Sequence, residues 1–127
     1  MSRSKLLLLF AVAAVVGLVA MASLAGAADR APTVIKIRGT QGDFHGRITS
    51  HRKACLGGRT VKVFKQKGDH QNPKRDSVIA KDTSAKVPGK QVGIWSVGNT
   101  GFKHGDFYAK ATRTDACKRA YSDTLSE

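Results

Sequence analysis

The sequence predicts an all-β protein: a single seven-stranded antiparallel β-sandwich that follows an N-terminal signal peptide. Three observations predict it. After residue 27 the chain alternates apolar and polar residues in short runs, turns bearing Gly, Pro and Asn separate these runs, and no amphipathic helical period is present. About 100 residues remain there, enough for one small domain. We therefore expect a helical signal peptide at 1–27 and one β-sandwich domain at 28–127.

The N-terminal segment has the layout of a secretory signal. Arg3 and Lys5 make a basic start, residues 6–22 are almost wholly apolar, and Ala25-Gly26-Ala27 supplies small residues at the positions that a signal peptidase reads. An uncleaved membrane anchor is the alternative, because about 17–20 apolar residues are near the lower limit for spanning a bilayer. The Ala-rich composition and the cleavage-type triplet favour cleavage after Ala27 or one residue later. The domain is then expected outside the cell or at the cell envelope.

The first three strands follow from β-branched residues and alternation. We expect them at 33–38, 44–48 and 60–64, separated by the turn 39–43 and by a Leu-Gly-Gly break before residue 59. In the third, Val61 and Val63 share one face and Lys62 the other.

Four further strands are expected after the polar, non-periodic stretch 66–75. The residues at 82–92 include a Pro-Gly pair and several lysines, and are expected to form a loop. The strands themselves are expected at 77–81, 93–97, 107–111 and 120–125, the last being weak.

Two cysteines, Cys55 and Cys117, are present. In a secreted chain an even pair predicts one disulfide with a single connectivity. Two free thiols or a metal pair are the alternatives, and the lack of a Cys-x-x-Cys spacing argues against metal. Closing a loop of about 60 residues is worth roughly 4 kcal/mol on the chain-entropy model.

The charge is strongly positive. Removing Arg3 and Lys5 from the 22 lysines and arginines leaves 20 basic against nine acidic residues, a net charge of about +11. Such a field favours acidic polymers, although it also keeps a protein soluble. The densest candidates for anion binding are Lys65, Lys67, Lys74 and Arg75 around the polar stretch, followed by Lys81, Lys86 and Lys90. Because consecutive sandwich strands reverse direction, the two groups are expected at opposite ends of the domain and binding is expected to be diffuse.

Several motifs carry a resemblance to a known family. They are Phe44-x-Gly46-x-Ile48, then Cys55, Gly58-x-x-Val61-x-Val63-Phe64, Gly93-Ile94-Trp95, and Tyr108-Ala109-Lys110-Ala111 before Cys117. This pattern resembles transthyretin-like and carboxypeptidase-regulatory-like domains, which are secreted sandwiches of prealbumin-type, immunoglobulin-like fold. The resemblance implies their fold. A lysine-rich insert at 84–92 replaces the family's Asp-x-x-Gly turn, and the Tyr-Arg-Gly-Ser ending of its hydrolase branch is lacking, so no enzymatic activity is transferred.

No residue pattern indicates a catalytic site, a metal, a cofactor or a specific nucleic-acid partner. No serine lies in a Gly-x-Ser-x-Gly context. The histidines lack metal-site spacing and are expected to be exposed; they are His45, His51, His70 and His104. The aromatic residues are expected to serve the core rather than a stacking platform. Trp95 and Phe107 are expected inside, whereas Phe64 and Tyr108 fall on the strand face shared with lysines and are expected to be exposed.

The function expected from these observations is non-enzymatic. The leading hypothesis is a structural or binding role, with an unknown protein or acidic polymer as partner. The alternative is a dedicated binder of anionic polymers that uses the lysine-rich loops. A transthyretin-related hydrolase is the third hypothesis.

Overall fold

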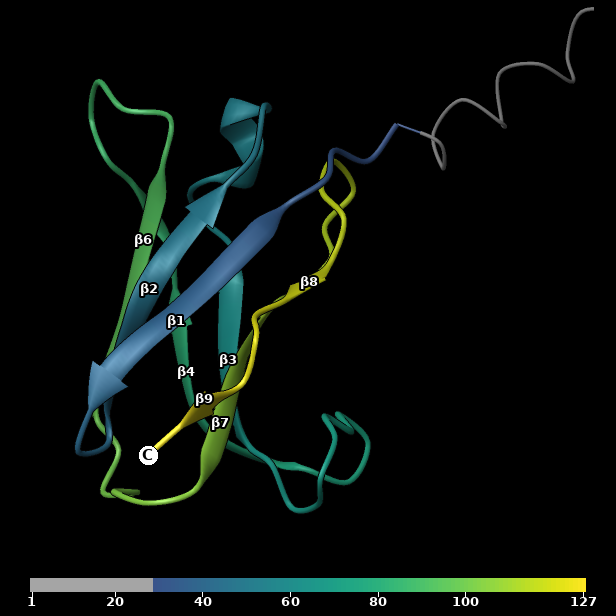
Figure 1. Cartoon of the computed structure of the whole chain (residues 1–127). Helices are drawn as coiled ribbons and strands as arrows, with labels where there is room; N and C mark the ends of the chain where they lie inside the picture. Colours follow the sequence, from purple (N-terminus) through teal and green to yellow (C-terminus); the bar gives the residue numbers. More distant parts are fainter. Residues whose placement is uncertain (1–28) are drawn as a thin grey trace, which may run out of the picture.

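The structure is a computed structural model that describes residues 29–127, which form two antiparallel β-sheets packed face to face (Figure 1). The expected signal peptide, residues 1–27, lies outside the described residues. One sheet has the strand order β1-β2-β6-β5; the other has the order β4-β3-β7-β8, and β9 also pairs with β7. The strands are β1 (Val34–Thr40), β2 (Asp43–Thr49), β3 (Thr60–Lys65), β4 (Ser77–Thr83), β5 (Ala85–Lys86), β6 (Gly93–Asn99), β7 (Asp106–Ala111), β8 (Ala120–Tyr121) and β9 (Leu125–Ser126).

The predicted all-β class is confirmed for residues 29–127. This part of the chain contains no α-helix, and its one helical element is a turn of 3-10 helix, η1 (Lys53–Cys55), after β2. No helix within these residues is long and apolar enough to cross a membrane.

One apolar core fills the space between the sheets. Both sheets contribute to it with the residues that strand alternation directs inward. The rings of Phe44 on β2 and Phe107 on β7 lie 4.6 Å apart between centroids and join the two layers. The expectation that Trp95 and Phe107 belong to the core is confirmed. The buried members are Ile35, Phe44, Ile48 and Trp95 from the four-stranded sheet, and Val61, Val63, Phe107, Ala109 and Ala111 from the other.

Trp95 requires a glycine beside it. Its in-register partner on β2 is Gly46, and a Cβ atom at position 46 would lie 2.7 Å from the indole Cζ2. The same Cβ would also collide with the main-chain carbonyl oxygen of Lys36, so a glycine, although it weakens a strand, is required here by both the strand β1 backbone and the indole ring.

Residues 29–127 contain nine strands where the sequence predicts seven. The expected loop 82–92 contains β5, because Ser84 turns the chain from one sheet into the other. Its buried hydroxyl donates to the Leu56 carbonyl and accepts the Arg59 amide, so the crossing is hydrogen-bonded throughout. The expected last strand is split into β8 and β9, because the Ala109 amide donates to the Ser122 hydroxyl in place of a strand carbonyl.

The prediction that Phe64 and Tyr108 are exposed is wrong. Their rings stack at 5.0 Å and are almost completely buried on the outer face of the five-stranded sheet. The connection 66–76 folds back over this face: Tyr108 donates from its hydroxyl to Asp76, and Gln71 donates to the carbonyl of Ser122 beyond β8. A residue directed away from the main core can thus still be buried by a loop.

Candidate functional site

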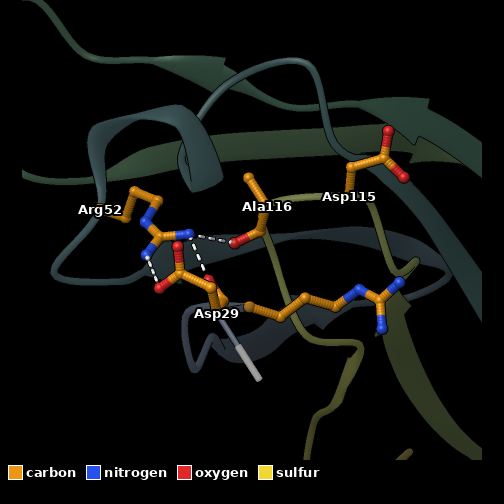
Figure 2. Close-up of a pocket in the computed structure, with 5 residues that line it drawn as sticks. Asp29, Arg52, Asp115 and Ala116 are labelled. Atoms are coloured by element: carbon orange, nitrogen blue, oxygen red, sulfur yellow. Dashed lines mark hydrogen bonds and ion pairs between the residues drawn. The ribbon is translucent and has the colours of Figure 1, made fainter. Parts of the chain in front are cut away.

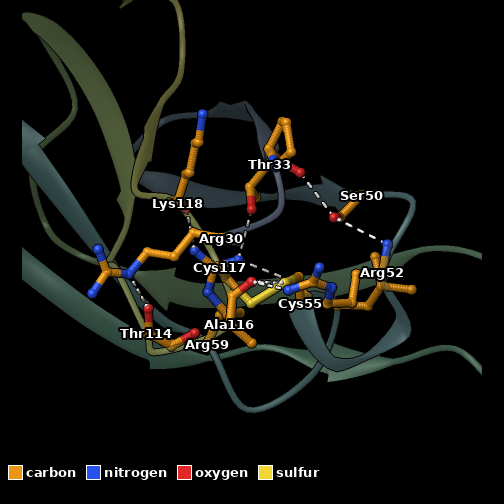
Figure 3. The surroundings of a disulfide bond; sticks show 12 residues. Arg30, Thr33, Ser50, Arg52, Cys55, Arg59, Thr114, Ala116, Cys117 and Lys118 are labelled. Carbon is orange, nitrogen blue, oxygen red and sulfur yellow. Dashed lines mark hydrogen bonds between the residues drawn. A yellow bond between two sulfur atoms is a disulfide. The ribbon is translucent and has the colours of Figure 1, made fainter. Parts of the chain in front are cut away.

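The predicted Cys55–Cys117 disulfide is confirmed (Figure 3). It joins residues 62 positions apart, with a Cα–Cα distance of 5.6 Å, and ties η1 to the segment before β8. With Ala31 the two cysteines form a small apolar cluster separate from the main core. The disulfide therefore closes one end of the sandwich.

Arg59 lies beside the disulfide and is almost fully buried, at 1% exposure. Its guanidinium uses all five N–H groups: it donates twice to the Thr112 carbonyl, once each to the carbonyls of Cys55 and Lys118, and once to the Thr33 hydroxyl, at 2.8–3.2 Å. Burial lowers the pKa of Arg59 below its ordinary value. Because no donor remains, this arginine is a structural element and offers nothing to a ligand.

A hollow of about 490 Å³ lies near the same end of the molecule (Figure 2). Arg52 spans it, donating to the main-chain carbonyls of Asp29 and Ala116 and pairing with the Asp29 carboxylate at 3.4 Å. The side chain of Asp115 points away from this guanidinium (Figure 2). These contacts of Arg52 attach the first described residues to the segment before β8.

A buried carboxylate organises the opposite end. Asp76 accepts hydrogen bonds from the amides of Lys67 and Asn72 and from the Tyr108 hydroxyl, at 2.6–2.9 Å. Burial alone would raise the pKa of Asp76, but these hydrogen bonds and the charge of Lys67 outweigh it and hold the pKa below its ordinary value. Burial, and then the adjacent carboxylate, raise the pKa of Tyr108 well above its ordinary value.

The residues predicted to bind anions are spread over this end. Lys67, Lys74 and Arg75 are exposed on the connection that Asp76 closes. Lys65 ends β3, and its ammonium lies 5.4 Å from the centre of the Phe102 ring. The second group is divided, since Lys81 lies on β4, Lys86 on β5 and Lys90 in the turn before β6. That turn contacts the far end of the sandwich through Gln91, which donates to the Ser50 carbonyl, so the two lysine-rich connections lie at opposite ends as expected.

A better-defined cationic site lies on the outer face of the five-stranded sheet. Lys62 on β3 stands directly opposite Lys81 on β4 and directly opposite Lys110 on β7. Neighbouring residues of β3 and β7 fill the core, so these three side chains point outward. We call Lys81, Lys62 and Lys110 the lysine row. Its three cations span about 10 Å, or two strand spacings.

Hydroxyl groups and one aromatic ring border the lysine row. Tyr121 on β8 is opposite Lys110, whose ammonium lies 5.6 Å from the ring centre. Thr83, Thr60 and Thr112 each stand two residues from one of these lysines, with Thr112 just beyond the end of β7. Thr60 is opposite Thr83, and the Thr112 amide donates to the Thr60 carbonyl. This face of the sheet thus offers positive charge, hydroxyl groups and one aromatic ring.

No carboxylate neutralises the lysine row. The cross-strand partners of its members are one another and Tyr121. Within residues 29–127 the one ion pair joins Arg52 to Asp29 and involves no member of the lysine row. The strand alternation indicated that Lys62 and Lys110 point outward, but only the register shows that they stand side by side.

The four histidines, His45, His51, His70 and His104, are exposed. In the described part of the chain no group of three or more His, Cys, Asp or Glu side chains is placed to hold a metal ion. No known protein-family model matches this sequence, and a comparison with curated proteins finds no match.

Proposed function

We propose that this protein is a secreted, disulfide-bonded β-sandwich that binds acidic polysaccharide through the lysine row and catalyses no reaction. Secretion is supported by the apolar N-terminal run with its Ala25-Gly26-Ala27 triplet, and by a disulfide, which is typical of oxidising compartments. We further propose that the fold is the prealbumin-type variant of the immunoglobulin-like sandwich. Two packed antiparallel sheets are compatible with it, while β5 and the split last strand would be departures.

The observation that carries the binding proposal is the direct opposition of three lysines. Like charges directly opposite one another on a sheet destabilise it. Lysines often protect edge strands from aggregation, but β3 and β7 are interior strands. Protection of an edge therefore does not explain Lys62 and Lys110, whereas binding an anionic chain does, since the ligand would neutralise the repulsion.

The class of polymer follows from what accompanies the charge. Single-stranded nucleic acid is held by aromatic platforms on which bases stack. Here Phe44, Phe64, Trp95, Phe107 and Tyr108 are all buried. The exposed face offers one ring, that of Tyr121, beside threonine hydroxyls, which suit sugar rings and their hydroxyl groups. An acidic polysaccharide is the partner that this combination fits best.

The test compares two variants that lose the same charge. Lys62→Gln/Lys81→Gln/Lys110→Gln removes the lysine row, and Lys67→Gln/Lys74→Gln/Arg75→Gln removes three loop cations as a matched control. Titration with heparin should show about a ten-fold loss of affinity for the row variant, because three surface charge contacts of roughly 0.5 kcal/mol each make about one decade. The affinity of the loop variant for heparin should fall by less than about three-fold.

Three results would contradict the proposal. Equal losses in both variants would mean that attraction is diffuse, and a loss confined to the loop variant would place the site among the lysine-rich loops. Equal binding of a single-stranded polynucleotide would point to nucleic acid instead. N-terminal sequencing of secreted material tests the proposed secretion and signal cleavage. Recovery of intact Met1 in a membrane fraction would refute secretion.

A further inference from the structure

A second set of cations occupies the opposite outer face, on the four-stranded sheet. Lys36 on β1 stands opposite Arg47 on β2, and Arg38 on β1 stands opposite His45 on β2. All four side chains are exposed. On its other side Arg47 meets Ile94 of β6 and His45 meets Ser96, so no cross-strand partner supplies a carboxylate. We call Lys36, Arg38, His45 and Arg47 the basic quartet.

The basic quartet and the lysine row point away from each other. The residues between them in each strand, such as Ile35 and Ile48 in one sheet and Val61 and Val63 in the other, meet in the common core. Packed sheets are about 10 Å apart, and the cationic side chains extend outward from both. The two charged groups are therefore separated by more than the screening length of about 8 Å at physiological salt.

We propose that the basic quartet is a second site for acidic polysaccharide, so that one molecule bridges two polymer chains. This inference rests on the proposed function of the lysine row. The two sites differ in chemistry, because guanidinium groups bind carboxylate or sulfate in a bidentate manner, whereas ammonium groups act as point charges. Since screening separates the faces, a chain bound on one of them leaves the other free to bind.

Edge protection does not account for this face either. β1 is an edge strand, but β2 lies between β1 and β6, and it carries Arg47 and His45. Each cation on β1 has a basic residue directly opposite it on β2. The same like-charge opposition therefore occurs on both outer faces, and on both it involves an interior strand.

The experiment separates bridging from binding. Three proteins are compared: the natural chain, the row variant Lys62→Gln/Lys81→Gln/Lys110→Gln, and the quartet variant Lys36→Gln/Arg38→Gln/His45→Gln/Arg47→Gln. Each is titrated with a short heparin oligosaccharide by calorimetry and with long-chain heparin by light scattering. Thermal unfolding first verifies that each variant is folded, and size-exclusion chromatography with light scattering verifies the same oligomeric state.

The natural chain should bind two short oligosaccharides per molecule, and its scattering with long heparin should rise and then fall as polymer is added in excess. Each variant should bind one oligosaccharide, and both should lose the scattering. A natural chain that binds one oligosaccharide and scatters no light would overturn bridging while leaving the proposed function intact. A quartet variant that still binds two oligosaccharides and still scatters light with long heparin would overturn the second site. A natural chain that binds no oligosaccharide would refute both proposals.

Discussion

The two ends of β3 each bury one charged side chain but surround it differently. Arg59, directly before the strand, is a cation held by neutral acceptors that come from Thr33, Cys55, Thr112 and Lys118. Asp76, whose neighbour Ser77 pairs with the last residue of β3, is an anion held by donors. Two of its three donors lie within nine residues of it in the chain.

This difference in sequence distance predicts a difference in cooperativity. The acceptors of Arg59 lie up to 59 residues away along the chain, so this side chain, together with the disulfide, joins segments that are distant in the sequence. Asp76 mainly closes its own loop and attaches it to Tyr108. Loss of Arg59 should therefore weaken the whole domain, whereas loss of Asp76 should first open the connection 66–76.

The largest expected effect is that of Arg59→Met. It removes five hydrogen bonds and leaves buried carbonyls without donors, so the free energy of unfolding should fall by about 3–5 kcal/mol. Arg59→Lys should recover only part of the loss, because an ammonium has three donors and no planar fork. Urea unfolding measures both variants, with the exposed Arg113→Met as control. A change below 1 kcal/mol for Arg59→Met would show that Arg59 does not hold this end together.

Removal of the disulfide comes next. Cys55→Ser/Cys117→Ser should lower the free energy of unfolding by about 2–4 kcal/mol, since the unfolded chain gains the freedom of the open loop. The Cys55 carbonyl accepts from Arg59, so the disulfide and the arginine should be coupled. Strict additivity in a double-mutant cycle with Arg59→Met would show that the two act independently.

The comparison also shows where sequence reasoning is strong. Alternation identified the inward residues Val61, Val63 and Phe107, because one face of each strand must be buried. It failed for Phe64 and Tyr108, because alternation shows which residues point away from the main core but does not show whether a loop covers them. Arg59 carries no sequence signal at all, since four of its five hydrogen bonds go to main-chain carbonyls.

For the lysine row, the sequence predicts the direction of the side chains but not their position side by side. The outward direction of Lys62 and Lys110 follows from the apolar residues on either side of each lysine. Their opposition depends on the register between β3 and β7, which the long-range fold determines. The prediction of Lys65, Lys67, Lys74 and Arg75 as anion-binding residues depended instead on their closeness along the chain, and three of the four lie on the connection 66–76.

Smaller effects are expected at the Asp76 end. Asp76→Asn and Tyr108→Phe should each cost about 1.5–3 kcal/mol, the range for a hydrogen bond to a charged group. Hydrogen exchange should accelerate first at the amides of Lys67 and Asn72, which donate to Asp76, while the Lys118 amide stays protected. Simultaneous loss of protection at Lys118 would mean that both ends unfold as one unit.

The pH dependence of stability should report on the Asp76–Tyr108 end specifically. Because the folded pKa of Asp76 lies below its unfolded value of about 3.9, its stabilisation is fully present above that value and is lost as the pH falls through the folded pKa. Tyr108 has the opposite sign: its raised pKa gives stabilisation below about pH 10 that is lost as the pH rises. Chemical unfolding from pH 2 to 11 should show both slopes, the acid one reduced in Asp76→Asn and the alkaline one in Tyr108→Phe. Unchanged slopes in these variants would assign the titration to other groups.

The smallest expected effect comes from the charge of Lys67. Its amide donates to Asp76, and its ammonium also lowers the pKa of that carboxyl. Lys67→Gln keeps the amide hydrogen bond and removes only the ammonium, so it should cost at most a few tenths of a kcal/mol at neutral pH. The pH midpoint of acid unfolding should nevertheless rise slightly at low salt. It should return to the value of the natural chain in 1 M salt, where the screening length is about 3 Å. Lys74→Gln, an equal change of charge on the same connection, is the control and should leave the midpoint closer to its natural value. If the two variants shift it equally, net charge rather than the Lys67–Asp76 interaction sets the acid stability of this end.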